Sequence, residues 1–302
     1  ESWLATSGGD YQSDDSAMIC LAGQAGRQWV VDHLTAFIDA VHPDYLKWDN
    51  NLWVNCDRGG HGHGAADGSF AHVTALYQIL DALRQRYPAL LIENCSGGGN
   101  RIDFAMLQYT DVAWMSDQTS PSIRVRHNVE GLSLIFPPAY LLSFVTDLGW
   151  EPLHNAPDLP LYSRSRMPQV FGMSFRSLWL SDADLAALGQ QIGFYKHLRP
   201  LVTAATATAL TMQANGDEKN WDILQESGTN GGVVLFAFSG AAAPASTTVS
   251  PANLSPDTVY QVVSIDGSVR GVMTGADLTR NGLTITRSPV TAAQILLLFP
   301  QR

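Results

Sequence analysis

Up to about residue 200, short apolar runs of strand length alternate with stretches in which apolar residues recur at helical spacing. Helices are expected around residues 30–41, from Asp67 onward and from Ser181 onward, where Asp184 completes a capping-box pattern. The predicted strands cover residues 45–49, 90–95, 112–117, 140–145 and 170–175. Alternation of this kind predicts a parallel sheet covered by helices.

Beyond Pro200 the helical periodicity disappears, and β-branched runs separated by turn residues take its place. These runs cover residues 232–238, 258–265, 283–286 and 294–299. They predict an antiparallel β-sandwich. The sequence therefore predicts an α/β region over residues 1–202 and an antiparallel β domain over residues 203–302.

Composition excludes some classes of function. The chain has 18 Lys and Arg against 28 Asp and Glu, a net charge of −10, and no basic block, so we expect no nucleic-acid partner. No apolar run reaches the roughly 18–20 residues that span a bilayer, so we expect no membrane association. The three cysteines, Cys20, Cys56 and Cys95, are too few and too scattered for a disulfide framework or a CxxC metal site. This usage favours a reducing, cytoplasmic location.

Charged residues stand where two of the predicted strands end. Lys47 and Asp49 share one face of the strand 45–49, whereas Trp48 points to the other face. Asp117 ends the strand 112–117. In a parallel barrel, active sites are built at this end of the strands, and two carboxylates there suit glycosidic hydrolysis. A buried ion pair at Asp49 and a turn or helix cap at Asp117 are the alternatives.

A glycine-rich segment, Cys95-Ser96-Gly97-Gly98-Gly99-Asn100-Arg101, follows the strand 90–95. Glycines in this position let the backbone approach a ligand closely. The segment matches neither the GxxxxGK[ST] nor the GxGxxG pattern, so nucleotide binding is not expected.

Together these stretches resemble glycoside hydrolase family 36, the α-galactosidase or melibiase family. The resemblance rests on Lys47-Trp48-Asp49, Glu93-Asn94-Cys95-Ser96-Gly97-Gly98-Gly99, Ser116-Asp117, Val170-Phe171-Gly172 and the segment from Phe194 to Leu201. It covers roughly residues 1–202, and the β region that follows resembles the family's C-terminal sandwich.

This resemblance implies retaining hydrolysis of terminal α-galactosides without a cofactor, on the later strands of a (β/α)8 barrel. Asp49 matches the family's nucleophile and Asp117 its acid/base. Lys47, Cys95 and Gly97 match positions that line the sugar pocket, and Trp48, Asn51 and Arg101 are further expected substrate contacts. The implied partner is a galactoside oligosaccharide, and homo-oligomerisation is possible in a full-length enzyme.

The opening residues resemble the segment after the family's third barrel strand. We therefore expect the chain to be a fragment that lacks the first three strands and an N-terminal β domain.

Other functions remain open at this point. The same scaffold suits an α-N-acetylgalactosaminidase or an α-galactosyl transferase, and a fragment could bind carbohydrate without catalysis. His61 and His63, with Cys56 and Asp57 nearby, could ligate zinc in a metal-dependent hydrolase. The primary expectation is that the site holds no metal. Arg124, Arg126 and His127 are expected on a helix, in a solvated or ion-paired face.

Overall fold

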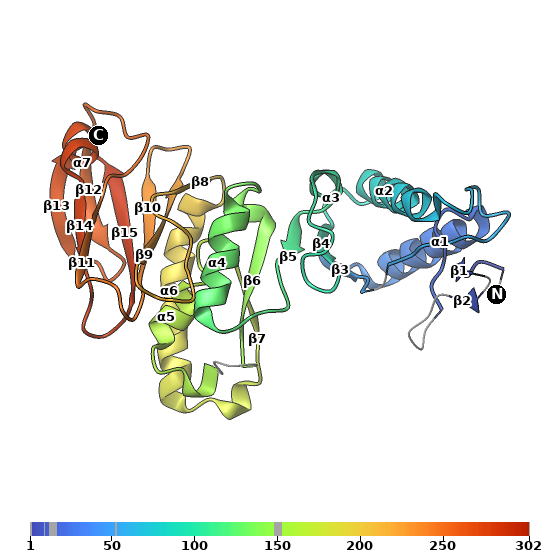
Figure 1. The fold of residues 1–302 in the computed structure, drawn as a ribbon, viewed down its shortest axis with the longest axis horizontal. Helices are drawn as coiled ribbons and strands as arrows, with labels where there is room; N and C mark the ends of the chain where they lie inside the picture. Colours follow the sequence, from blue (N-terminus) through green and yellow to red (C-terminus); the bar gives the residue numbers. More distant parts are fainter. Residues whose placement is uncertain (1, 9, 12–16, 52, 148–152, 302) are drawn as a thin grey trace. The chain divides into compact units, whose positions relative to one another are not determined.

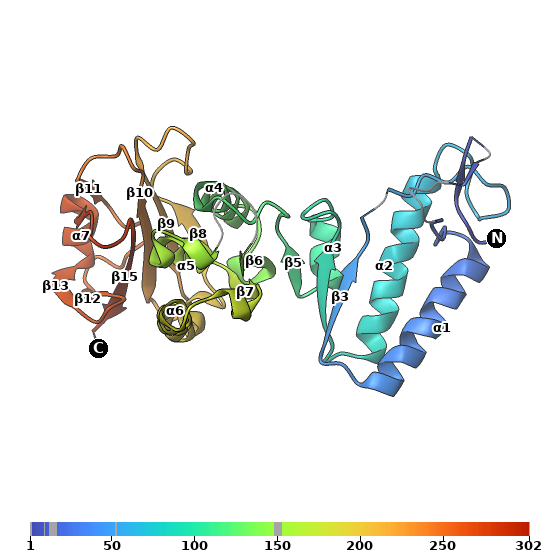
Figure 2. The same ribbon diagram turned by 90° about the horizontal axis from the view of Figure 1, so that it is seen from below.

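The computed structural model describes residues 2–8, 10–11, 17–51, 53–147 and 153–301, and the chain divides into two units, Glu1–Trp114 and Met115–Arg302 (Figures 1 and 2). The elements of the first unit are β1 (Thr6–Ser7), β2 (Asp10–Tyr11), α1 (Gln24–Val41), β3 (Tyr45–Asp49), α2 (Gly68–Arg86), β4 (Leu91–Cys95), α3 (Phe104–Tyr109) and β5 (Val112–Trp114).

Strands β3, β4 and β5 of the first unit pair in parallel and in chain order. Such pairing requires a crossover between consecutive strands, which α2 and α3 supply. Apolar residues of α2 at helical spacing, Leu76, Ile79, Leu80 and Leu83, are buried in one cluster with Ile92 of β4. Helices α1 and α2 lie side by side in both views (Figures 1 and 2). The helices therefore cover one face of these strands and leave the other face for polar side chains.

The second unit begins with a second α/β segment. Its elements are α4 (Ser122–Ser133), η1 (Pro138–Tyr140), β6 (Leu141–Thr146), η2 (Leu153–Asn155), α5 (Leu159–Arg164), β7 (Val170–Ser174), η3 (Ser177–Trp179) and α6 (Asp182–Val202). Strands β6 and β7 are parallel. The predicted capping box is present at the start of α6, where the side chains of Ser181 and Asp184 each accept a hydrogen bond from the other residue's backbone N–H. The sequence pattern thus located the start of α6 correctly.

Antiparallel strands make up the rest of the second unit. They are β8 (Thr206–Ala209), β9 (Trp221–Ser227), β10 (Val233–Ser239), β11 (Ser246–Val249), β12 (Val259–Ser264), β13 (Val269–Thr274), β14 (Leu283–Thr286) and β15 (Ala293–Pro300), with the short helix α7 (Gly275–Asn281) between β13 and β14. Among the described residues, one sheet has the order β13-β12-β15-β10-β9-β8 and a smaller sheet pairs β11 with β14.

The central strand β10 is apolar along its length because both of its faces are buried. Val233 and Leu235 pack into a cluster shared with β11 and β14, as in a sandwich. Val234 and Phe236 pack into a different cluster that contains residues of α6. A strand covered on both sides requires a continuous apolar run rather than alternation, which explains the run in the sequence.

The predicted fold class is confirmed: parallel strands with helices precede an antiparallel β region. The loss of helical periodicity beyond Pro200 did not reveal the short helix α7, which lies within the β region. Thr274 caps α7 by accepting a hydrogen bond from the Asp277 backbone, a local signal that the wider periodicity hides. The division into residues 1–202 and 203–302 remains a prediction. In the part of the chain that the structure describes, no helix combines the length and apolar character needed to cross a bilayer.

Glu226 on β9 is an uncompensated acid in this core. Its side chain is fully buried, and neither carboxyl oxygen has a hydrogen-bond partner among the described residues. Burial alone raises the pKa of Glu226 well above its ordinary value of 4.5. The folded state therefore holds a proton that the unfolded chain releases above that pH.

We predict that folding stability falls as pH rises above 4.5, because the folded state binds the extra proton. Replacing Glu226 with Gln removes this titration. In urea unfolding between about pH 5 and pH 8, the unfolding free energy of the variant should rise relative to that of the parent chain by up to ~1.4 kcal/mol per pH unit. Asp257→Asn, at an exposed position, is the control and should show no such trend. A pH-independent difference for Glu226→Gln would contradict a buried, protonated Glu226.

Candidate active site

The end of β3 presents two of the predicted site residues on one face. Exposure alternates along the strand, with Tyr45, Lys47 and Asp49 exposed and Leu46 and Trp48 packed against the apolar cluster beneath the helices. The predicted alternation of Lys47 and Asp49 against Trp48 is therefore confirmed. This arrangement separates the Trp48 side chain from the other expected substrate contacts.

Glu93 of β4 lies across from Lys47 in the parallel register and is almost completely buried. Its Oε1 lies 3.1 Å from Lys47 Nζ, in an ion pair that lacks a well-aligned hydrogen bond at Oε1. The Tyr45 hydroxyl donates to Glu93 Oε2 at 2.5 Å. Sequence reasoning did not select Glu93 or Tyr45 as site residues. The signal was available, because residues two apart along a strand point to the same face of the sheet. This spacing places Tyr45 with Lys47 on one strand and Glu93 with Cys95 on the next.

Cys95, at the end of β4, is paired in register with Asp49. Burial raises the pKa of the Cys95 thiol to about 11, and a hydrogen bond with Asp49 and the charge of Asp49 add to this against the opposing effect of Lys47. For Lys47, burial lowers the pKa, but the ion pair with Glu93, with contributions from Cys95 and Asp49, raises it overall. At neutral pH this face therefore carries a cationic amine and a neutral thiol beside the Asp49 carboxyl group.

The glycine-rich loop after β4 folds back onto the segment after β3. The Gly97 backbone N–H donates to Asn51 Oδ1 at 2.7 Å, and the Ser96 hydroxyl donates to the Asn50 carbonyl at 2.5 Å. Gly97 has φ +51°, and a Cβ there would lie 3.0 Å from the Asn100 side chain, so this position favours glycine. The structure thus brings the predicted residues Asn51 and Gly97 into direct contact.

Arg101 joins the carboxyl ends of the two strands. Its Nη2 donates to the Trp48 carbonyl at 3.0 Å and to the Cys95 carbonyl at 2.7 Å. Both acceptors are backbone carbonyls, so Arg101 fixes the two strand ends. It thereby positions Asp49, which directly follows Trp48. Trp48 contributes its carbonyl group to this arrangement.

Asp117 belongs to the second unit and does not end a strand. The prediction of a strand over residues 112–117 was wrong at its end, because β5 stops at Trp114. The Ser116 hydroxyl accepts a hydrogen bond from the Gln118 backbone, and the Asp117 carbonyl accepts one from Thr119. Such local bonds turn the backbone away from a strand, so Asp117 is an exposed loop residue.

Arg166, which is fully buried, holds this loop. Its guanidinium group donates to the carbonyls of Thr119, Tyr162 and Phe144 and to the Ser122 hydroxyl. It also lies 3.8 Å from the centre of the Tyr162 ring. A buried charge with this many fixed acceptors makes the segment after Asp117 rigid.

A cavity of about 1310 Å³ adjoins the loop within the second unit. Ser116 and Gln118, which flank Asp117, line it together with Arg124, His127 and residues 212–218. The expected ion-paired role is confirmed for Arg126, whose Nε donates to buried Asp222 at 2.8 Å. Arg124 donates to the Gln118 side chain, and a ring nitrogen of His127 lies 2.8 Å from the Ala214 carbonyl.

Asp49 and Asp117 lie in different units, so the separation of their carboxyl groups remains a prediction.

The alternative metal-ligand set is assembled in part. Cys56, His61 and His63 gather around Cys20, whereas Asp57 accepts hydrogen bonds from the Thr6 hydroxyl and the Gly8 backbone. Sequence reasoning missed Cys20 because it lies 36 positions before Cys56 and only the fold brings the two together.

Known proteins with related sequences have longer chains than this one. The chain is 28% identical over 234 residues to the bifunctional alpha-galactosidase/sucrose kinase AgaSK of Mediterraneibacter gnavus, a match that covers 78% of this chain and 24% of that protein. It is 26% identical over 254 residues to alpha-galactosidase 1 of Pediococcus pentosaceus, covering 83% of this chain and 34% of that protein. The chain thus spans about a quarter to a third of the length of these curated relatives.

The fold is also found in solved structures. The GH36 alpha-galactosidase AgaA of Geobacillus stearothermophilus, in complex with raffinose, superposes with a TM-score of 0.84 at 21% identity, over 99% of this chain and 42% of that one. The family model described as Melibiase matches residues 7–205, well over half of the 302 residues. The chain therefore belongs to the Melibiase family.

Proposed function

We propose that this chain carries the catalytic groups of a retaining glycoside hydrolase that cleaves terminal α-galactosides. The arrangement at the ends of β3 and β4 carries the proposal: Asp49 shares an exposed strand face with Lys47 and is paired in register with the neutral Cys95 thiol. Membership of the Melibiase family and the alpha-galactosidase names of the relatives support it.

Asp49 acts as the nucleophile. Its ionised carboxylate attacks the anomeric carbon and forms a covalent glycosyl-enzyme while the bond to the leaving group breaks. The cationic Lys47 on the same strand face places a positive charge near this carboxyl group. Cys95, protonated at neutral pH, adds no competing negative charge.

Asp117 acts as the acid and then as the base. As an acid it protonates the leaving-group oxygen, and as a base it takes a proton from the water that hydrolyses the glycosyl-enzyme. Retaining geometry requires the two carboxyl groups to lie roughly 5–5.5 Å apart. The fixed loop after Asp117 and the adjoining cavity support this assignment.

Lys47, Cys95, Gly97 and Asn51 are the proposed substrate contacts, and Arg101 holds them in position through the strand ends. Crystal structures of AgaA variants contain bound raffinose in one case and bound stachyose in another. We infer that a galactoside oligosaccharide is also the substrate here. The two-carboxylate mechanism needs no cofactor.

We predict that Asp49→Ala lowers turnover of an aryl α-galactoside on the order of 10⁴-fold or more, because the nucleophile is lost. The assay uses the protein encoded by the complete gene that contains these residues. Added azide should restore part of the activity and give β-galactosyl azide, since a small anion then attacks from the vacated face. Asp44→Ala removes an exposed carboxylate just before β3 and should leave turnover unchanged. Turnover by Asp49→Ala within tenfold of the parent enzyme would contradict the assignment.

For Asp117→Ala, the loss should depend on the leaving group. Cleavage of melibiose, whose sugar leaving group needs a proton, should fall on the order of 10²–10⁴-fold. Formation of the glycosyl-enzyme from a p-nitrophenyl galactoside, followed as a pre-steady-state burst, should fall much less. Asp257→Ala is the control in the same unit. An equal loss for both substrates would show that Asp117 has a structural role only.

A further inference from the structure

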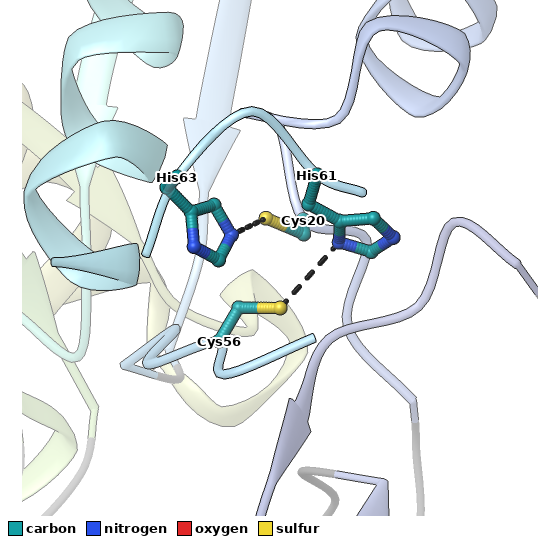
Figure 3. Close-up of side chains that lie close together, drawn as sticks. All are labelled: Cys20, Cys56, His61 and His63. Carbon is teal, nitrogen blue, oxygen red and sulfur yellow. Dashed lines mark hydrogen bonds between the residues drawn. The ribbon is translucent and has the colours of Figure 1, made fainter. Parts of the chain in front are cut away.

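Two cysteines and two histidines of the first unit direct their side chains toward one another (Figure 3). One sulfur or nitrogen atom from each of Cys20, Cys56, His61 and His63 lies within 4.8 Å of the others. Cys20 Sγ is 3.4 Å from His63 Nε2, and Cys56 Sγ is 3.5 Å from His61 Nδ1. The four residues come from separate positions in loops and not from one regular element.

These side chains are shielded from solvent. Cys20 and Cys56 are 0% exposed and His61 is 6% exposed, whereas His63 is intermediate. The apolar cluster around the two cysteines is small, with Ala5 and Val54 as its other fully buried members. So small a core stabilises three loop segments only weakly, and a metal cross-link would supply what it lacks.

The hydrogen bonds of the two imidazoles determine which ring nitrogens carry lone pairs. His63 Nδ1 lies 2.8 Å from the Gly64 carbonyl, and His61 Nε2 lies 2.8 Å from the Ser2 carbonyl. A carbonyl only accepts, so each of these nitrogens must be an N–H donor. In neutral rings the lone pairs are then on His63 Nε2 and His61 Nδ1, the two atoms that face the sulfurs. Metal-binding histidines are oriented in this way, by donating their other N–H to a backbone carbonyl.

Two sulfur–nitrogen distances in the cluster also fit a tetrahedral metal. With Zn–S near 2.3 Å and Zn–N near 2.0 Å, a tetrahedron has S···N edges of about 3.5 Å. The observed 3.4 and 3.5 Å agree with this value.

The backbone of the loop is shaped to bring the ligands together. Gly62, between the two histidines, has φ +79°, which places both rings beside the cysteines with little steric cost. A Cβ at Gly68 would lie 1.9 Å from the Cys56 carbonyl oxygen, so only glycine permits this packing.

We propose that Cys20, Cys56, His61 and His63 form a structural zinc site. Two thiolates and two neutral imidazoles are a typical Zn²⁺ ligand set, and four protein ligands leave no open position for catalysis. Binding displaces one proton from each thiol to solvent, so Zn²⁺ and two thiolates give a site with no net charge, which suits its burial. The zinc joins the segment before α1 to the loop between β3 and α2, which begins with the Asn50 and Asn51 contacts to the glycine-rich loop.

Metal content and cobalt spectroscopy test this proposal without an activity assay. The gene-encoded protein, purified without chelator, should contain zinc by elemental analysis. Replacement of zinc by Co²⁺ should give the d–d bands of tetrahedral cobalt together with a thiolate-to-cobalt charge-transfer band. Loading the metal-free protein with Zn²⁺ should release two protons per ion, and a strong chelator should lower the Tm.

Matched variants assign the signal to this cluster. Cys20→Ser and Cys56→Ser should each lose one zinc equivalent, and each should weaken the charge-transfer band. His63→Asn replaces the most exposed ligand, so it is the variant that best retains the fold. It should weaken Co²⁺ affinity by at least about 100-fold. Loss of a residue that only supports a metal ligand costs up to about 100-fold, and loss of a ligand itself should cost no less. Cys95→Ser and His33→Gln, which lie outside the cluster, should keep the parent metal content.

Three results would overturn the proposal. One is a folded protein that contains no zinc and takes up no Co²⁺. Another is cobalt uptake that is equal in the parent protein and His63→Asn. The third is a Cys20–Cys56 disulfide that persists in protein prepared under reducing conditions. Loss of galactoside hydrolysis with zinc still bound would bear on the proposed function alone, so the two proposals fail separately.

Discussion

The proposed site depends on the contacts of the buried Glu93 carboxylate with Lys47 and Tyr45. A charge removed from water is costly unless opposite charge and hydrogen bonds compensate it, and here Lys47 and Tyr45 supply both. Because all three side chains must share one face of the sheet, they fix the register of β3 against β4. That register places Asp49 opposite Cys95 at the carboxyl ends of the strands. The helix-covered face carries the apolar residues, so the polar residues and the core residues cannot exchange faces without a slip in register.

Two arginines, the partly buried Arg101 and the fully buried Arg166, hold the loops in a similar way. Arg101 joins two strand ends through their carbonyls, and Arg166 joins the Thr119 carbonyl, in the segment after Asp117, to the carbonyls of Phe144 and Tyr162. Both orient the backbone through these contacts, and contact of Arg101 with substrate stays a prediction. The cluster of Cys20, Cys56 and two histidines would add a third constraint of the same type. At the cysteine–histidine cluster the apolar core is small, so a metal contact would fix segments that have few apolar contacts of their own.

The sequence predicted regular elements well where local patterns decide them. Strand β3 was predicted at its observed bounds, and the capping box at Ser181 identified the start of α6. Interactions distant in the sequence explain the failures. The role of Glu93 appears only when the register of two strands is known. Cys20 joins the Cys56 cluster only after residues far apart in the chain pack together. At Asp117 the error was local, because the hydroxyl of the preceding Ser116 turns the backbone and ends the strand early.

The central claim is that Asp49 forms a covalent bond to the sugar. A fluorinated galactosyl donor with a good leaving group forms a glycosyl-enzyme quickly and hydrolyses it slowly, so the intermediate accumulates. Digestion of the labelled gene-encoded protein, followed by mass spectrometry, locates the modified residue. The account predicts one galactosyl adduct, on the peptide that contains Asp49, at the Asp49 carboxyl group. An adduct on another carboxylate, in an enzyme that is inactivated at the same rate, would contradict it.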